Sequence, residues 1–180
     1  MDRKRSAVFV GLGLFLAVLL FAVQPGFAAS LAALAILGNG PDGGSTNISC
    51  THATDPLCPT SHTCWCNSSH GSATTKLAGL AKATFAADTV IDLSSVVGTC
   101  DNTSGHVAIT SGSGTNSLVL DYSGLGCTAG SDFGINVSYI VDSSASTGKF
   151  AGATGTGLIS GSEDPSNGDI LGNVSGNIIP

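Results

Sequence analysis

The stretch FGINVSYIV, residues 133–141, places apolar side chains at alternate positions, with glycine, asparagine and serine between them. This period of two is that of a β-strand with one buried face. Two upstream stretches, HVAIT (106–110) and SLVLDY (117–122), alternate in the same way, and Gly112-Ser113-Gly114 between them predicts a hairpin. Residues 82–93 add one long or two short strands. The sequence therefore predicts an all-β chain.

Residues 147–161 read TGKFAGATGTGLISG, in which Phe150 is the one large aromatic side chain. A helix here would lose about 0.5–1 kcal/mol at each interior glycine relative to alanine. A strand accommodates glycine where it bends or where another backbone comes close. The pair Asn167-Gly168 predicts a hairpin that returns residues 169–179 antiparallel to this stretch. We therefore expect a closely packed strand, and the expected anchors of the core are Phe133, Tyr139 and Phe150.

The N-terminus carries Arg3, Lys4 and Arg5 ahead of an apolar run over residues 7–23, which is the pattern of a secretory signal. Small residues at Gly26 and Ala28 predict cleavage after Ala28, with a later site after Ala35 as the alternative. A retained membrane anchor is the other interpretation, but the run is slightly shorter than the ~18–20 residues that span a bilayer. We expect residues 1–28 to be a signal peptide and the mature protein to be secreted (extracellular, periplasmic or cell surface).

Six cysteines follow the signal, and an even count in an exported chain favours disulfides. The predicted 106–122 hairpin brings its two ends together, so we expect Cys100 to pair with Cys127. Cys50, Cys58, Cys64 and Cys66 would then pair among themselves, and Cys-x-Cys neighbours rarely pair with each other. The alternative is a zinc or copper site, for which the candidate ligands are His52, Cys58, His62, Cys64, Cys66 and His70. Because export oxidises thiols, we favour disulfides and expect no cofactor or metal.

Turn residues set the predicted organisation of the mature chain. Glycine and proline over residues 38–44 interrupt regular structure, so residues 29–48 are expected to be a flexible lead-in. Residues 50–70 lack periodicity and predict a disulfide-stapled loop with a short strand around Trp65. The whole of residues 49–180 is then a single β-domain.

Charge limits the partners that the mature chain can have. Removal of residues 1–28 leaves three lysines against eleven acids, a formal net charge of −8. Such a surface repels phosphate backbones, which argues against nucleic acid and anionic lipid as partners, and no membrane contact is expected after signal cleavage. Glu163 and its acidic neighbours fit a hairpin turn better than a calcium loop. The remaining aspartates are scattered, and no catalytic residue is assigned.

The motif TGKFAGATG resembles the signature of dirigent proteins and allene-oxide-cyclase-like barrels, which runs approximately Gly-Gly-Thr-Gly-Lys/Arg-Phe-x-x-Ala-x-Gly. The matching residues are Thr147, Gly148, Lys149, Phe150, Ala153 and Gly155. Ala145-Ser146 stands where the family usually has Gly-Gly, and Thr154 stands where dirigent proteins commonly carry arginine. The chain is also similar to uncharacterised exported bacterial β-proteins that share the motif, over roughly residues 76–180. The resemblance implies an eight-stranded antiparallel barrel, and no catalytic residue is carried over from it.

These observations favour an exported antiparallel β-barrel of about eight strands that acts as a non-catalytic structural or ligand-binding module. One alternative is a dirigent- or cyclase-like barrel acting on an apolar small molecule. Another is a cell-surface adhesin or fibre subunit. A β-sandwich or a β-solenoid is the rival fold, although no repeat of constant period supports the solenoid.

Overall fold

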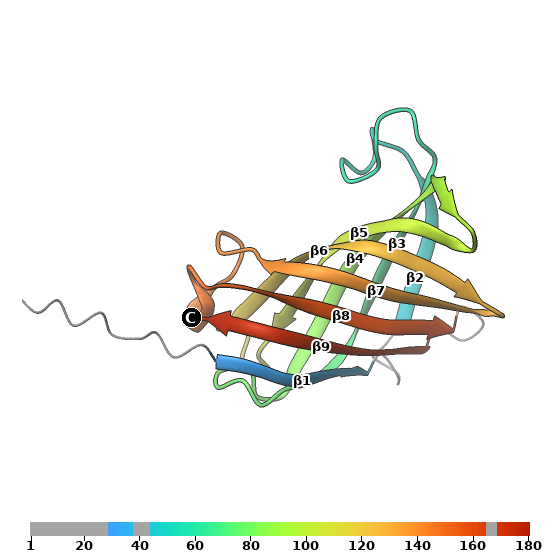
Figure 1. Cartoon of the computed structure of the whole chain (residues 1–180). Coiled ribbons are helices and arrows are strands. Elements are labelled where there is room, and N and C mark those ends of the chain that lie inside the picture. The colour runs from blue at the N-terminus through green and yellow to red at the C-terminus, as the bar shows by residue number, and fades with distance from the viewer. Residues whose placement is uncertain (1–28, 38–43, 165–168) are drawn as a thin grey trace, which may run out of the picture.

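The computed structural model describes residues 29–37, 44–164 and 169–180; the predicted signal peptide lies outside them. Within these residues the chain forms nine strands and one short 3-10 helix (Figure 1). No helix in this part of the chain has the length and apolar character needed to cross a membrane. The elements are β1 (Ala29–Leu37), β2 (Gly44–Cys50), β3 (Cys64–Thr74), β4 (Ala83–Val97), β5 (Cys100–Thr110), β6 (Ser117–Ala129), β7 (Asp132–Val141), η1 (Gly148–Phe150), β8 (Thr154–Asp164) and β9 (Asp169–Ile179).

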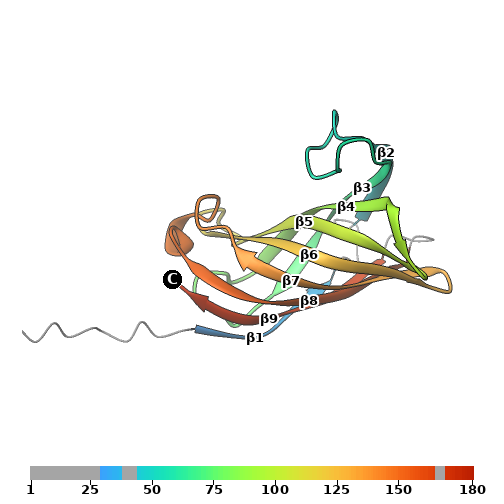
Figure 2. The ribbon, with the colours of Figure 1, turned by 45° about the horizontal axis from the view of Figure 1, so that its top comes forward.

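All nine strands belong to one antiparallel sheet in the order β1-β9-β8-β7-β6-β5-β4-β3-β2. β1 pairs with β9 and also, through Ala35–Leu37, with Ser72–Thr74 of β3. The sheet therefore curls back on itself, and its ends meet over three residues of β1 (Figure 2). β2 follows β1 along the same edge of β3. The all-β antiparallel prediction is confirmed; a sandwich would need two stacked sheets and a solenoid would need parallel ladders.

The strands follow the predicted alternation, with odd-numbered side chains of β7 facing the inside of the curled sheet. Val137 is 1% exposed and Tyr139 is 2% exposed, whereas Ile140 between Tyr139 and Val141 is 58% exposed. The predicted hairpin is present as β5 and β6, which pair from Thr110–Ser117 at the turn to Cys100–Cys127 at the open ends. Apolar side chains from seven strands meet inside in one core, which includes Phe85, Ile109, Leu118, Leu120, Val137, Tyr139, Val174 and Ile178.

One end of the curled sheet is closed by side chains from its connections, and we call it the filled end. Phe150 in η1 is 1% exposed, and Leu80 from the β3–β4 connection is fully buried in the same core. Asn116 joins these connections: its side-chain amide donates to the Gly79 carbonyl at 3.0 Å, and its oxygen accepts from the Lys149 N–H at 3.0 Å. Phe150 is thus the buried anchor that we expected, but it lies in a turn before the strand, which begins at Thr154.

The glycines of β8 allow an aromatic ring to lie flat against the sheet. Tyr139 pairs across from Gly157, which in turn pairs with Gly176 of β9. A Cβ atom on Gly157 would lie 2.6 Å from Cε1 of Tyr139, and one on Gly176 would collide with the Tyr139 hydroxyl. The close packing expected of this stretch is therefore packing against Tyr139.

One prediction about the N-terminal part is wrong: residues 29–48, expected to be a flexible lead-in, contain β1 and most of β2. The strand expected near Trp65 is present, but it is longer than expected and forms the eleven-residue β3. The local sequences of these strands lack the apolar alternation of β7. β2 and β3 pair with each other across residues 51–63, whereas β1 takes its main partner from a distant part of the chain. β1 pairs with β9, more than 130 residues later.

Three disulfides are present: Cys50–Cys66, Cys58–Cys64 and Cys100–Cys127. The pairing expected for Cys100 and Cys127 is found, between directly opposed residues of β5 and β6 with a Cα–Cα distance of 4.0 Å. The other two disulfides hold residues 51–63 against the outer face of the sheet. Cys50, Cys58, Cys64 and Val90 form a second small core there. Three disulfides indicate an oxidising, extracellular-type environment.

Candidate ligand-binding site

The interior is not filled along its whole length. Toward the β6–β7 connection and the adjoining ends of β8 and β9, which we call the hollow end, it contains a cavity of about 90 Å³. The strands carry small residues at several inward positions here, including Ser69, Ala87 and Gly161. The described residues that line the cavity come from β3 to β9 and include Asn67, Ser69, Phe85, Ala87, Thr89, Ile91, Val107, Tyr122, Phe133, Ile135, Ile159, Gly161 and Glu163.

An amide and a carboxylate meet at one wall of this cavity. Nδ2 of Asn67 donates to Glu163 at 3.1 Å from Oε2 and 3.4 Å from Oε1. Asn67 is 6% exposed and comes from β3, whereas Glu163 comes from β8, so the contact crosses the interior between strands that are not neighbours. The pair gives an otherwise apolar cavity one strongly polar wall, which would orient a ligand.

Phe133 belongs to this cavity and not to the filled core. It is only half-buried, so the expectation that it anchors the core alongside Tyr139 and Phe150 is wrong. Its ring lies over Gly126, where a Cβ atom would collide with it. The ring lines the cavity together with Ile135 and Gly161, so it borders open space.

Tyr122 forms the floor of the cavity. Its ring crosses Gly105, and its hydroxyl hydrogen-bonds the Thr89 hydroxyl at 2.5 Å. Burial raises the pKa of Tyr122 to about 12, which outweighs the opposing effect of the Thr89 hydrogen bond. The phenol therefore stays protonated at neutral pH, and Glu163 is the one carboxylate among the described lining residues.

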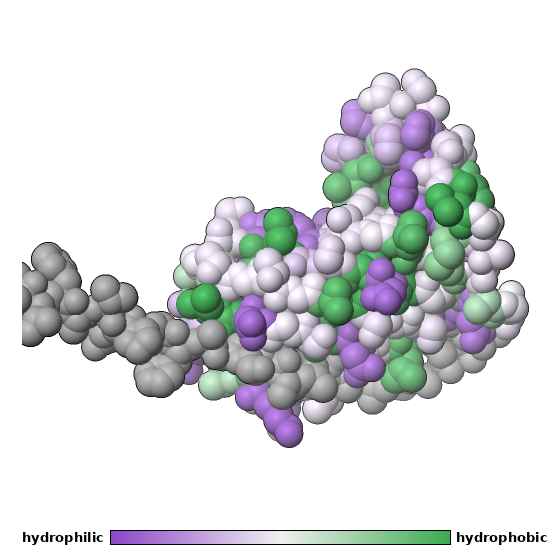
Figure 3. Space-filling view, viewed as in Figure 1, coloured by the Kyte–Doolittle hydropathy of each residue, from purple (hydrophilic) through white to green (hydrophobic). Residues whose placement is uncertain are grey.

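A second hollow lies outside the sheet, beside the lobe formed by the disulfide-stapled residues 51–63 (Figure 3). This outer cleft measures about 370 Å³. Leu57 and Pro59 line its loop side, and its floor is formed by residues of β4, β5 and β6: Val90, Asp92, Asn102, Thr103, Ser104, Ser123 and Leu125.

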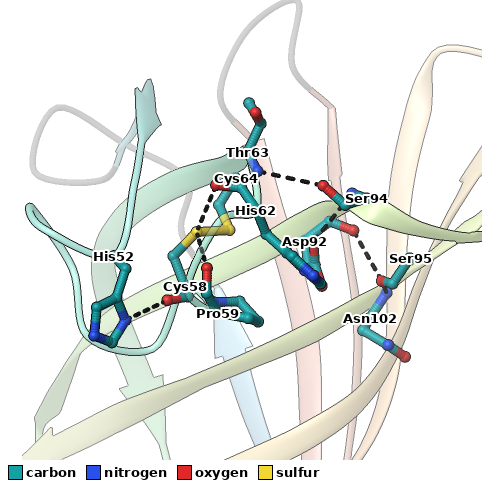
Figure 4. Close-up of polar contacts among 10 residues, drawn as sticks. All are labelled: His52, Cys58, Pro59, His62, Thr63, Cys64, Asp92, Ser94, Ser95 and Asn102. Carbon is teal, nitrogen blue, oxygen red and sulfur yellow. Dashed lines mark hydrogen bonds and ion pairs between the residues drawn. A yellow bond between two sulfur atoms is a disulfide. The ribbon is translucent and has the colours of Figure 1, made fainter.

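Polar contacts fix the loop above this cleft (Figure 4). His62 Nδ1 lies 2.8 Å from Oδ2 of Asp92, and the Ser94 N–H donates to Oδ1 at 3.0 Å. Burial raises the pKa of Asp92, but the hydrogen bonds from His62 and Ser94 outweigh it and leave that pKa below its ordinary value. The Thr63 N–H also donates to the Ser94 hydroxyl at 3.3 Å. The loop is thus held by hydrogen bonds to the Asp92 carboxylate and to Ser94 as well as by its disulfides.

The candidate metal ligands do not form a metal-binding set. Cys58, Cys64 and Cys66 are bound in disulfides, which removes three thiolates from the candidate site. His52 contacts the Cys58 carbonyl at 2.7 Å, His62 contacts Asp92, and His70 is exposed on the outer face of β3. Among the described residues, no three histidine, cysteine or acidic side chains are placed to share an ion.

Sequence reasoning missed the Asn67–Glu163 pair. Asn67 lies in the cysteine-rich stretch that we interpreted as a loop, and Glu163 was assigned to a turn. The two residues are 96 positions apart, and only the curling of the sheet brings them together. Glu163 does fall on the same alternation as Ile159 and Gly161, and that was the available signal for an inward-facing carboxylate.

The chain matches no known protein family, no curated protein and no solved structure.

Proposed function

We propose that this protein is an exported, disulfide-stabilised module that binds a small, largely apolar ligand in the cavity at the hollow end. The observation that carries this proposal is the cavity itself: apolar side chains surround it, and the Asn67–Glu163 pair supplies one polar wall. At about 90 Å³ it suits a ligand, or the end of a ligand, of only a few heavy atoms, since an apolar cavity of roughly 150 Å³ holds benzene.

Binding explains the lining better than catalysis does. General acid–base work uses a pair of groups that titrate near the working pH. The described lining residues provide one carboxylate and a phenol whose pKa is about 12, which supports a binding module. A cyclase-like activity on an apolar molecule would have to rely on the shape of the cavity and on Glu163, the single carboxylate among the described lining residues.

The exported location is the second part of the proposal. The basic and apolar N-terminal residues have the pattern of a signal peptide, and the three disulfides suit an oxidising compartment. The motif of residues 147–155 supports a distant relationship to dirigent-like barrels. The curled antiparallel sheet is the kind of scaffold that this relationship implies, and we propose the relationship on those two grounds.

Two substitutions on β4 test the ligand site. Ala87 lines the cavity, whereas the adjacent Ala86 faces outward and is exposed. Ala87→Ile should fill the cavity and abolish binding of a small neutral probe such as 1-butanol, monitored by NMR shifts of Ile135 and Ile159. Ala86→Ile is the matched control and should leave binding unchanged. Equal binding by both variants would contradict the assignment of the site.

A further inference from the structure

We propose that the ligand carries a protonated amine, which binds the Glu163 carboxylate while the hydrocarbon part occupies the apolar cavity. This inference rests on the proposed function and specifies the chemical class of its ligand.

The first support is the place of Glu163 in the cavity wall. Asn67 donates from its buried position to both carboxylate oxygens, which holds the carboxylate in one orientation. Asn67 is neutral, so it orients the carboxylate without cancelling its charge. A carboxylate can accept several hydrogen bonds at once, so the Asn67 contact is compatible with a ligand donor at the same group.

The second support is the distribution of charge along the molecule. Lys76 and Lys82 lie in the β3–β4 connection and Lys149 lies in η1, so all three belong to the filled end. Asp92, Asp101, Asp132 and Glu163 lie near the strand termini at the hollow end. Strands of eleven residues span about 35 Å, several times the ~8 Å screening length in physiological salt. The lysines therefore do little to offset the negative field at the hollow end.

The chemistry of the ligand follows from that field. An ammonium group supplies positive charge and three hydrogen-bond donors, so its hydrogen bond to the carboxylate is also an ion pair. An alcohol of the same size donates one hydrogen bond to the carboxylate and brings no positive charge of its own. A carboxylate ligand would place like charges together and be repelled.

The test compares three probes that share a four-carbon chain: butylamine, 1-butanol and butyrate. Their affinities for the disulfide-bonded protein are measured at pH 7 and low salt by NMR titration, following the methyl groups of Ile135 and Ile159. We expect butylamine to bind at least tenfold more tightly than 1-butanol, and butyrate to bind most weakly. Glu163→Gln should bring butylamine to within about threefold of 1-butanol.

Asp132→Asn is the matched control, because Asp132 is exposed at the same end and its substitution changes the net charge equally. It should preserve the preference for butylamine. If Asp132→Asn removes the preference as fully as Glu163→Gln does, the field and not the cavity carboxylate selects the amine, and the inference is wrong. Equal affinities of the wild-type protein for butylamine and 1-butanol would also overturn it, while leaving the ligand site in place. Failure of all three probes to bind would contradict the proposed function itself.

Discussion

The filled and hollow ends of the curled sheet are built by the same strands, yet one is a packed core and the other contains a cavity. At the filled end the inward positions carry Tyr139, Leu118 and Ile109, and Phe150 closes the space between them. At the hollow end the inward positions include Gly161, Ala87 and Ser69. The alternation is the same at both ends, and the core and the cavity share Phe85 and Ile159, so the small residues among the larger ones leave the space that the cavity occupies.

The largest contrast is expected between two phenylalanines. Phe150→Ala should lower the free energy of unfolding by about 3–5 kcal/mol, because it removes a buried ring and leaves a cavity at the filled end. Phe133→Ala should cost clearly less, because its half-buried ring already borders open space. Denaturant unfolding of both variants measures the difference. Equal losses would mean that the two ends are packed alike.

The next largest difference in stability is expected between variants that lack the Cys100–Cys127 disulfide and variants that lack the Cys58–Cys64 disulfide. Replacing Cys100 and Cys127 with alanine should cost about 3–4 kcal/mol, because the bridge closes a loop of 27 residues in the strand-rich part of the chain. Replacing Cys58 and Cys64 opens a loop of only 6 residues and should cost about 2 kcal/mol. Thermal unfolding under non-reducing conditions compares them. A larger loss for the second pair would mean that the outer loop, not the β5–β6 hairpin, dominates stability.

The features that the sequence predicts correctly are the local ones. Alternation identifies β7, a glycine turn identifies the β5–β6 hairpin, and that hairpin predicts Cys100–Cys127. The strand β1 and the Asn67–Glu163 contact depend on pairings between distant parts of the chain, for which no local pattern exists. The strand β2 pairs with its neighbour β3 but lacks the apolar alternation that would have identified it. The position of Phe133 beside a cavity was equally hidden, because an inward-facing aromatic ring has the same alternation in a core as in a binding site.

Two histidine–aspartate pairs provide a third contrast. Asp92→Asn should lower stability at pH 7 by about 1.5–3 kcal/mol, because it weakens a partly buried, charge-assisted hydrogen bond to His62. Asp88→Asn should change stability by less than about 1 kcal/mol, since the His106–Asp88 pair is exposed.

The pH dependence follows from the lowered pKa of Asp92. The contribution of Asp92 to stability is complete above the ordinary carboxyl pKa of 3.8. It is lost as the pH falls through the lower pKa that Asp92 has in the folded protein. The difference between wild-type and Asp92→Asn should therefore shrink below about pH 4. A difference that stays constant down to pH 2 would show that Asp92 acts through packing alone.

The smallest contrast concerns two tyrosine hydroxyls. Tyr122→Phe should cost about 0.5–1.5 kcal/mol, because it removes the hydrogen bond to Thr89 at the cavity floor. Tyr139→Phe should be neutral or slightly stabilising, because the buried Tyr139 hydroxyl has no hydrogen-bond partner among the described residues. Chemical denaturation of the two variants measures both changes in the free energy of unfolding. A greater loss of stability for Tyr139→Phe than for Tyr122→Phe would contradict the prediction that only the Tyr122 hydroxyl makes a stabilising hydrogen bond.

The central claim is that the interior is open at one end and filled at the other, and xenon tests it most directly because xenon enters apolar cavities. Methyl NMR spectra of the disulfide-bonded protein are recorded with and without xenon pressure. Shifts should be concentrated at Ile91, Ile135 and Ile159, which line the cavity, while Leu80, Leu118 and Ile178 in the filled core stay unchanged. Equal shifts at the two ends, or shifts confined to the filled core, would contradict the account.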